Sequence, residues 1–319
     1  MSDLPKSVKI NEEGPREGFQ IESATIPTSR KIELIDALSE TGIRHMQIVS
    51  FVSPTRVPGM ADAEQVVMGI KPNPDVHYTG LWLNEKGLQR AMATGRLAIE
   101  GKISLSASEK FLKRNQNKTL AEQIDYNHRV IDMYREHGIR VTRASVMAAF
   151  GCNFEGDIAP ARVVAMVNEI VQIASLHGET IEVLSLADTM AWANPESVKR
   201  VVGAVRERHP DLRLSLHLHD TRGMGIANAY AGLQMGVDMF DASVAGLGGC
   251  PFAGHKSAAG NVCTEDLVFM CEEMGISTGI DLERLLACAQ LAEQVVAHPL
   301  PGSVMHGGSL RKLRAASNA

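Results

Sequence analysis

The sequence predicts an α/β protein, a parallel (β/α)8 barrel with a C-terminal helical extension. Short β-branched segments alternate with longer helix-like segments along the chain, as in a parallel sheet whose strands are joined by helices. Eight such units fill residues 1–278, which is a typical barrel length. No G-x-G-x-x-G motif opens the first helix, so a doubly wound open sheet is the less favoured alternative.

Each expected strand is a short run of β-branched or large apolar residues, and each expected helix is a longer run with apolar residues at helical spacing. The strands are expected at residues 8–12, 45–50, 77–83, 102–106, 140–147, 180–186, 212–218 and 238–244. Helices are expected at residues 29–40, 62–69, 86–94, 120–137, 225–235 and 281–297. The segments GPREGFQIES and SASEKFLKRNQNK are expected to be loops, and Pro160 suits the first turn of a further helix.

The chain is expected to divide into a barrel domain, residues 1–278, and a C-terminal helix and tail, residues 279–319. The segment HPLPGSVMHGGSLRKLRAASNA after the last helix is interrupted by Pro and Gly and ends in basic residues. This composition predicts a mobile tail or a segment packed on a neighbour.

Composition excludes several classes of protein. The 319 residues include 45% hydrophobic and 22% charged residues, close to the average of soluble globular proteins. The net charge is -5 and no long basic run is present, so nucleic acid is not an expected partner. No apolar run approaches a membrane span, and MSDLPKSVKI resembles neither a signal peptide nor a presequence. Five cysteines without a C-x-x-C pair favour a reducing compartment, and we expect a cytoplasmic location.

The segment LSLHLHDTRG, residues 214–223, places two histidines at the carboxyl end of the seventh expected strand. Because successive side chains of a strand point to opposite faces, His217 and His219 share one face. Two neutral imidazoles at this spacing suit a metal ion that also accepts oxygen ligands. The alternative is a pair of histidines that make only structural contacts beside a loop.

Ligands bind at the carboxyl ends of the strands in a barrel of this type, and several polar residues map to that end. They are Arg16 and Glu17 after the first strand, Gln47 in the second, Asp188 after the sixth, His217 and His219 in the seventh, and Cys250 and Asn261 after the eighth. Residues with purely structural roles would have no reason to gather at one end. The sequence therefore predicts a functional site there.

A resemblance to the 3-hydroxy-3-methylglutaryl-CoA lyase family rests on four segments: GPREGFQ, SFVSPTRVPGM, HLHDTRG, and QMGVDMFDASVAGLGGCPFA with GNVCTEDL. This family belongs to a wider group of metal-dependent barrel lyases, synthases and aldolases. The resemblance extends from residue 8 to about residue 286 and implies a TIM barrel that holds a divalent cation, Mg²⁺ or Mn²⁺. It also implies an acyl-CoA substrate and a homodimer, since members of the family often pair.

Carried over by position, the resemblance implies that the metal ligands are Glu17, His217, His219 and Asn261. Arg16 would polarise a thioester carbonyl and stabilise the enolate that forms when the carbon-carbon bond breaks. Cys250 would protonate the resulting carbanion, and Asp188 is a further expected catalytic residue. The base is left open between His217 and Glu17. The substrate would be a tertiary 3-hydroxyacyl-CoA, cleaved by retro-Claisen chemistry to acetyl-CoA and a keto acid or ketone.

The same resemblance implies the substrate contacts. Lys113, Arg114 and Asn115 match the part of the family that contacts the CoA phosphates, with a solvated charged loop as the alternative. Further expected contacts are Gln20, Gln47, Thr189 and Glu265. Glu265 either holds the Gly-rich loop by a hydrogen bond or belongs to the cap of the next helix, because Thr264 is a good N-cap residue.

The sequence departs from the family pattern at four places. Glu17 replaces an Asp, and Gln47 replaces a Glu. The loss of the negative charge at position 47 is expected to leave Arg16 less neutralised and to change the groups with which Arg16 pairs. ADTMAW at 187–192 replaces a smaller GDT-I-G segment and is expected to add bulk near the acyl pocket. The Gly-rich loop is longer than usual, with residues 255–256 added. We expect these changes to alter the acyl group that the protein accepts.

Two other functions stay open. A synthase or aldolase of the same group would run the chemistry towards condensation, although the cysteine in GLGGCPFA favours a lyase. A barrel that only binds a CoA ester or a metal ion is the non-catalytic alternative, suggested by Glu17 and Gln47. The retention of Arg16 and Cys250 argues against it, because a pure binding protein needs no proton donor.

Overall fold

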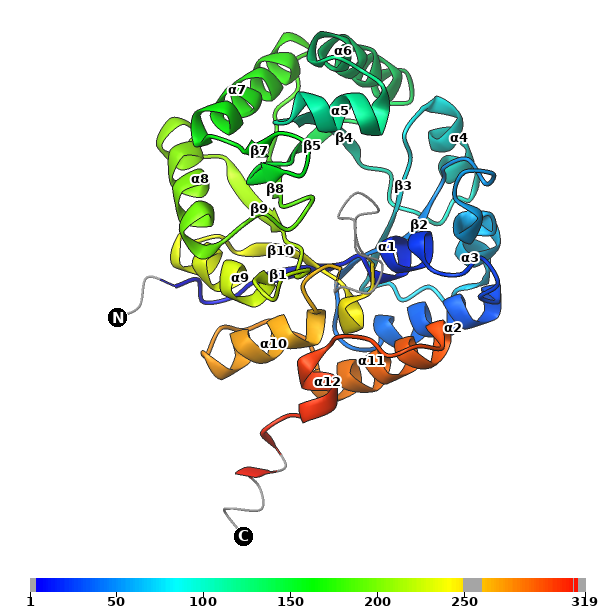
Figure 1. The fold of residues 1–319 in the computed structure, drawn as a ribbon. Coiled ribbons are helices and arrows are strands. Elements are labelled where there is room, and N and C mark those ends of the chain that lie inside the picture. Colours follow the sequence, from blue (N-terminus) through cyan, green and yellow to red (C-terminus); the bar gives the residue numbers. More distant parts are fainter. Residues whose placement is uncertain (1–3, 249–259, 312, 315–319) are drawn as a thin grey trace.

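The computed structural model describes residues 4–248, 260–311 and 313–314 and confirms the α/β barrel (Figure 1). Its main sheet has eight parallel strands in the order β3, β2, β1, β10, β9, β8, β5, β4. The helices form a ring outside these strands. One face of each strand therefore packs against helices, and the other faces the barrel axis.

All eight expected strands are confirmed. They are β1 (Lys9–Glu12), β2 (His45–Ser50), β3 (His77–Leu81), β4 (Gly101–Ser106), β5 (Val141–Met147), β8 (Val183–Ala187), β9 (Arg213–His217) and β10 (Met239–Ala242). A small antiparallel hairpin of β6 (Gly151–Cys152) and β7 (Gly156–Asp157) lies in the loop after β5.

Seven of the helices were predicted correctly. They are α2 (Thr28–Ser39), α3 (Ala63–Gly69), α4 (Glu85–Ala93), α6 (Leu120–Glu136), α7 (Pro160–Leu176), α9 (Gly225–Gln234) and α11 (Leu282–Val296). The remaining ring elements are α8 (Pro195–Arg208), α10 (Thr264–Glu273), and the 3₁₀ turns η1 (Pro58–Met60) and η2 (Val244–Gly246). Local capping explains several boundaries: Pro160 begins α7, and Thr119 and Glu122 form a capping box at the start of α6. Among the described residues, no helix is both long and apolar enough to cross a membrane.

Two segments that were expected to be loops contain short helices. These are α1 (Gly14–Ile21), which has Pro15 in its first turn, and α5 (Glu109–Gln116). Ser108 caps α5 by accepting a backbone hydrogen bond, and Asn117 ends it in the left-handed conformation, with φ of 53°. The sequence of α1, GPREGFQI, contains Gly and Pro, and that of α5, EKFLKRNQ, is strongly polar, so both compositions favour a loop. The cap residues of α5 were a usable signal.

The segment after α11 packs on helices of its own chain, so the prediction of a mobile tail is wrong for residues 298–308. It contains α12 (Ser303–Gly307), which contacts α10 and α11. The Val304 N–H donates to Asp266 Oδ1 at 2.7 Å, and Met305 is buried in the main apolar core. The division of the chain at residue 278 stays a prediction.

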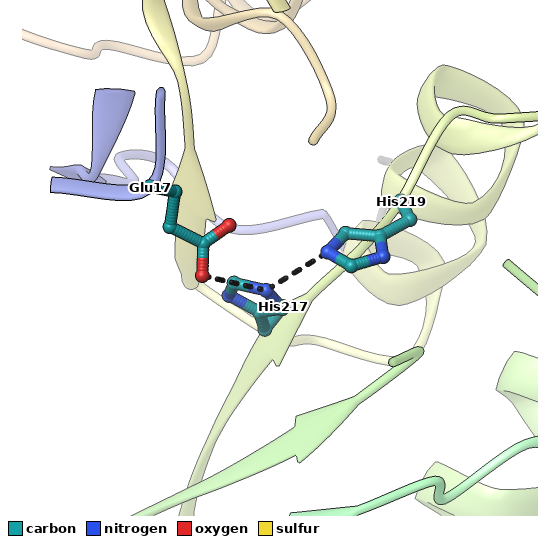
Figure 2. A group of neighbouring side chains, drawn as sticks. All are labelled: Glu17, His217 and His219. Carbon is teal, nitrogen blue, oxygen red and sulfur yellow. Dashed lines mark hydrogen bonds and ion pairs between the residues drawn. The ribbon is translucent and has the colours of Figure 1, made fainter. Parts of the chain in front are cut away.

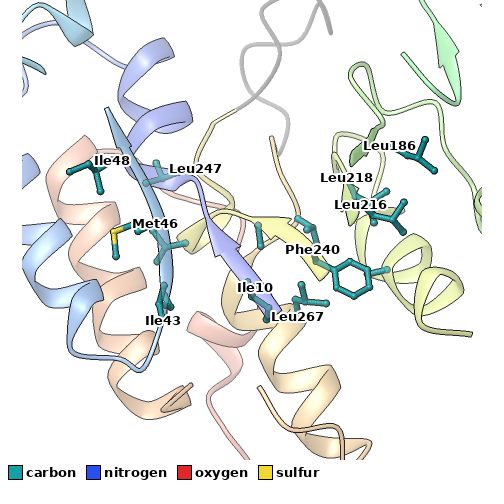
Figure 3. Close-up of a cluster of buried hydrophobic side chains, with 14 of the residues drawn as sticks. Ile10, Ile43, Met46, Ile48, Leu186, Leu216, Leu218, Phe240, Leu247 and Leu267 are labelled. Carbon is teal, nitrogen blue, oxygen red and sulfur yellow. The ribbon is translucent and has the colours of Figure 1, made fainter. Parts of the chain in front are cut away.

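Alternation along the strands separates an apolar core from a polar barrel interior. Outward-facing side chains such as Ile10, Met46 and Phe240 are buried between the sheet and the helices (Figure 3). Inward-facing serines form one row across four neighbouring strands: Ser104, Ser145, Ser185 and Ser215. They line a cavity of about 810 Å³. Barrels of this type are usually filled by branched apolar side chains, so a polar interior marks space for a ligand.

Two buried carboxyl groups hold the loops at the carboxyl ends of β1 and β10. Glu12 accepts hydrogen bonds from the N–H groups of Gly14 and Val244, at 2.7 and 2.9 Å, and from Thr264 Oγ1 at 2.6 Å. Glu265 accepts the N–H of Ala245 at 2.9 Å. Burial raises the pKa of Glu12 to about 7 and that of Glu265 to about 8.

The substitution Glu265→Gln is expected to stabilise the protein at pH 8 but not at pH 4.5. Because the pKa of Glu265 rises from 4.5 to about 8 on folding, only the unfolded chain ionises this carboxyl between these values. The stability contributed by Glu265 is therefore complete below pH 4.5 and is lost as the pH rises towards 8. In urea unfolding, the free energy of unfolding of the variant relative to wild type should rise by about 4 kcal/mol across this range.

Glu136→Gln, at an exposed position of α6, is the matched control for this comparison. If the difference between Glu265→Gln and wild type is the same at both pH values, Glu265 is not protonated in the folded protein.

Candidate active site

The predicted pair of histidines lies at the carboxyl end of β9. His217 is the last residue of β9, and His219 forms an isolated bridge with Asn261. The Nε2 atoms of the two imidazoles are 3.3 Å apart, and Glu17 Oε1 of α1 is 3.8 Å from His217 Nε2. Figure 2 shows the carboxylate and the two rings directed towards one another. Their ligand atoms all lie within 4.8 Å of one another, so one cation can contact all three side chains.

Asn261 joins this group from the other side. Its Nδ2 donates to the Glu17 carboxylate and to Ser243 Oγ, the latter at 2.8 Å. Its Oδ1 is buried and has no hydrogen-bond partner in the part of the chain that the structure describes. A buried, unpaired amide oxygen beside a carboxylate and two imidazoles suits a divalent cation that accepts nitrogen and oxygen ligands. The side chains present therefore fit the cation that the sequence predicts.

Neighbouring charges set different protonation states for the two imidazoles. Burial lowers the pKa of His217, but the carboxylates of Glu17, Asp241 and Glu13 outweigh burial and raise it to about 9. Burial and the positive charge of His217 lower the pKa of His219 to about 4. Binding of a cation through both rings must therefore displace a proton from His217.

Arg16 lies at the centre of a network of acceptors. Its Nη1 is 2.6 Å from Glu17 Oε1, its Nε donates to Gln47 Oε1, and its Nη2 donates to the Glu13 carboxylate. Arg16 is neutralised by two carboxylates, Glu13 and Glu17, although Gln47 carries no charge. A change of pairing relative to the family stays a prediction. Burial raises the pKa of Glu17, but Arg16 and the two imidazoles outweigh burial and keep that pKa well below its usual range.

Two carboxylates of the site were missed at the sequence level. Glu13 precedes α1, and Asp241 lies on β10. Asp241 Oδ2 is 3.2 Å from His217 Nδ1, and Asp241 Oδ1 accepts a hydrogen bond from Asn11 at 2.8 Å. Because Asp241 occupies Nδ1, the Nε2 of His217 is directed towards Glu17. Because side chains alternate along β10, the buried position of Phe240 places Asp241 on the inner face of the barrel. This alternation could have identified Asp241 from the sequence.

The cavity brings together many of the expected contacts. The expected substrate-binding residues that line it are Gln20, Gln47, Asn115 and Thr189. Lys113 and Arg114 are exposed and do not line it, and the Arg114 guanidinium lies 4.4 Å from the centroid of the Phe154 ring. Lys118, which was not predicted, lines the cavity with Tyr126 and supplies a cation at its rim.

Asp188 and Glu265 lie behind the cavity wall. Asp188 Oδ1 accepts the N–H groups of Trp192 and Ala193 at 2.7 and 3.0 Å, and burial raises the pKa of Asp188 to about 7. Glu265 accepts a hydrogen bond from the backbone of Ala245. This contact supports the alternative in which Glu265 holds the Gly-rich loop, and not a direct contact with substrate. Neither residue lines the cavity as described, and the catalytic role of Asp188 stays a prediction.

The bulk of the ADTMAW segment points away from the cavity. Met190 is buried in a small separate apolar cluster, and the Trp192 indole donates to Asn153 Oδ1 at 2.7 Å. From this segment only Ala187 and Thr189 line the described part of the cavity. Met190 and Trp192 therefore add no bulk to the described part of the cavity, and added bulk near the acyl pocket stays a prediction.

Fold and site together define a class of protein: a barrel enzyme with a cluster of two imidazoles, a carboxylate and an amide that suits a divalent cation at the carboxyl ends of its strands. A family model narrows this class further. The model of the HMGL-like family matches residues 7–292, and the chain belongs to this family.

Individual relatives agree with this assignment. The mitochondrial hydroxymethylglutaryl-CoA lyase of Bos taurus is 43% identical over 283 residues, which cover 89% of this chain and 84% of the relative. The crystal structure of the HMG-CoA lyase of Bacillus subtilis matches with a TM-score of 0.87 and 37% identity, covering 96% of this chain and 99% of that one. An HMG-CoA lyase from Acinetobacter baumannii in complex with coenzyme A and 3-methylmalate matches with a TM-score of 0.85 and 37% identity, covering 98% of both chains. The resemblance inferred from the motifs is confirmed, and the protein is a lyase.

Proposed function

We propose that the protein cleaves 3-hydroxy-3-methylglutaryl-CoA, or a related branched 3-hydroxyacyl-CoA, to acetyl-CoA and a keto acid. For 3-hydroxy-3-methylglutaryl-CoA the keto acid is acetoacetate. The observation that carries this proposal is the cluster of Glu17, His217 and His219 beside Arg16 in one polar cavity. The names of the relatives support the same substrate.

Glu17, His217, His219 and Asn261 would hold the cation, Mg²⁺ or Mn²⁺. A bound divalent cation supplies Lewis acidity towards the hydroxyl and carboxylate oxygens of the substrate and lowers the pKa of the hydroxyl group. The protein supplies the proton acceptor, for which His217 and Glu17 are the alternatives. The hydroxyl oxygen then becomes the carbonyl oxygen of the keto acid.

Arg16 is placed to stabilise the other product. When the carbon-carbon bond breaks, its electron pair moves into the thioester and forms an enolate. A guanidinium at the enolate oxygen stabilises this charge more strongly than it stabilises the neutral thioester. Glu13 and Gln47 fix the plane of the guanidinium before substrate binds, so little reorganisation is needed.

Cys250, which lies outside the described residues, would return a proton to the enolate carbon and complete acetyl-CoA. We expect Cys250→Ser to lower kcat by about 10²-fold to 10⁴-fold with little change in KM, because only proton donation is impaired. Cys271→Ser, a buried thiol on α10, is the control. A wild-type kcat for Cys250→Ser would remove this residue from the mechanism.

The direct test of function is an assay of purified protein with Mg²⁺ or Mn²⁺ and 3-hydroxy-3-methylglutaryl-CoA. Acetyl-CoA and acetoacetate should appear in equal amounts. A panel of other branched 3-hydroxyacyl-CoA esters would identify a different acyl preference. If no ester is cleaved, and acetyl-CoA with a keto acid instead releases free CoA, the protein is a synthase.

The substitution Asp241→Asn is expected to weaken cation binding by about 10-fold to 100-fold, because Asp241 orients His217 through Nδ1. Calorimetric titration with Mn²⁺ measures this effect. Asp238→Asn, which removes an ion pair with Arg213 outside the cavity, is the matched control. Equal affinities in the two variants would exclude the orienting role of Asp241.

We further propose a cytoplasmic location and a homodimer. The described cysteines, Cys152, Cys263, Cys271 and Cys288, are all free and buried, which supports a reducing compartment. Light scattering of the purified protein tests the homodimer.

A further inference from the structure

A second group of metal-ligating side chains lies at the end of the barrel opposite to the candidate active site. His45 begins β2, His77 begins β3, and Glu100 immediately precedes β4. Because the strands are parallel, these positions mark the amino-terminal mouth, whereas His217 marks the carboxyl-terminal one. His45 and Glu100 also line the cavity, but the proposed reaction and the expected substrate contacts assign no role to any of the three residues.

The geometry of this group is that of a ligand set. His77 Nε2 is 3.2 Å from Glu100 Oε1, and His45 Nε2 is 3.6 Å from the same oxygen. All three ligand atoms lie within 4.8 Å of one another. Neighbouring ligands of a tetrahedral zinc ion are about 3.4 Å apart, as follows from bonds of about 2.1 Å. Small side-chain rotations therefore suffice to place one ion between them.

His45 and Glu100 each have an atom that is available to bind a cation. His45 Nε2 is buried and has no hydrogen-bond partner among the described residues. Glu100 Oε1 lies within 3.6 Å of both imidazoles, so this carboxylate oxygen is directed at the place where an ion would sit. The side chain of His77 is 46% exposed, which leaves a path for the ion and room for a water molecule as a further ligand.

The group also spans a seam in the sheet. Strands β3 and β4 are the two ends of the strand order, and no ladder joins them in the described chain. One backbone hydrogen bond, from Ala98 N–H to Tyr78 O at 2.8 Å, connects β3 to the segment that leads into β4. His77 lies on one side of this seam and Glu100 on the other, so an ion bound by both would link the edges.

We propose that His45, His77 and Glu100 form a second metal site, which binds Zn²⁺ and closes the seam between β3 and β4. Two imidazoles and one carboxylate are a donor set that suits Zn²⁺. Arg143 Nη1 lies 3.5 Å from the same Glu100 Oε1, so this guanidinium helps to hold the carboxylate in place. We assign this site a structural role, because it joins the amino-terminal ends of strands, whereas Arg16 and the cation ligands lie at the carboxyl ends.

The experiment isolates this site in the double variant His217→Ala, His219→Ala, which lacks the imidazoles of the active site. Calorimetry with Zn²⁺ and the visible spectrum of added Co²⁺ then report the second site. We expect one Zn²⁺ per chain, tetrahedral Co²⁺ absorption, and a higher Tm in the presence of Zn²⁺. Adding His77→Gln should weaken Zn²⁺ binding about 10-fold or more and remove the Tm increase.

His128→Gln in the same background is the control, because His128 Nδ1 lies 2.8 Å from His177 Nε2 in a separate imidazole pair. No Zn²⁺ binding, or binding that is lost with His128→Gln and kept with His77→Gln, overturns the proposal. The result does not depend on the proposed reaction: a protein that cleaves no acyl-CoA but binds this Zn²⁺ would contradict only the proposed function.

Discussion

Replacing His217 and His219 together by alanine is expected to abolish binding of the active-site cation and to lower kcat by roughly 10⁴-fold, which corresponds to about 5 kcal/mol of lost transition-state stabilisation. The two rings are half of the expected ligand set, and their Nε2 atoms lie 3.3 Å apart beside Glu17. A carboxylate and an amide oxygen alone would bind Mg²⁺ or Mn²⁺ weakly, because most of the ion would keep its water. Mn²⁺ titration and an assay of acetyl-CoA release measure the two effects.

The pair His128 and His177 offers a matched control for this double variant. These imidazoles are also in contact, but they lie between α6 and the end of α7, outside the cavity. Their double replacement by alanine should leave Mn²⁺ affinity and kcat at wild-type values. If instead the His217, His219 variant keeps wild-type Mn²⁺ affinity, the assignment of the ligands is wrong.

Replacing Arg16 by lysine is expected to lower kcat/KM by about 10²-fold to 10³-fold, the usual effect of losing one donor to a developing oxyanion. Lysine keeps the positive charge between Glu13 and Glu17, so the buried carboxylates remain paired and the protein should fold. It cannot donate in a fixed plane to Glu13, Gln47 and substrate together, because an ammonium lacks the planar fork of a guanidinium. Steady-state kinetics measure the loss, and circular dichroism confirms folding.

Arg90→Lys tests whether replacing an ion-paired arginine by lysine outside the cavity changes the kinetics. Arg90 forms a two-point ion pair with Glu64 and does not line the cavity. We expect wild-type kinetics for Arg90→Lys. An Arg16→Lys variant that is as active as Arg90→Lys would show that Arg16 does not stabilise the transition state.

The strands and long helices could be predicted because their patterns act over a few neighbouring residues. Short runs of β-branched or large apolar residues identified β2 and β9, and Pro160 marked the start of α7. The same reasoning failed for α1, whose sequence contains Gly and Pro, and for α5, whose sequence is strongly polar, because both compositions are typical of loops. Cap residues identify α5, since Ser108 caps its start and Asn117 ends it.

The sequence by itself determined the barrel, the imidazole pair and the family, since these depend on local spacing and on motifs that can be seen in one segment at a time. Only the tertiary structure decided which groups meet. Glu13 supplies the negative charge beside Arg16 that the neutral Gln47 lacks, and Asp241 orients His217. These groups meet because β1, β2, β9 and β10 surround one axis. The charge that a buried cation requires can come from any chain segment that reaches it, so no spacing rule predicts its source.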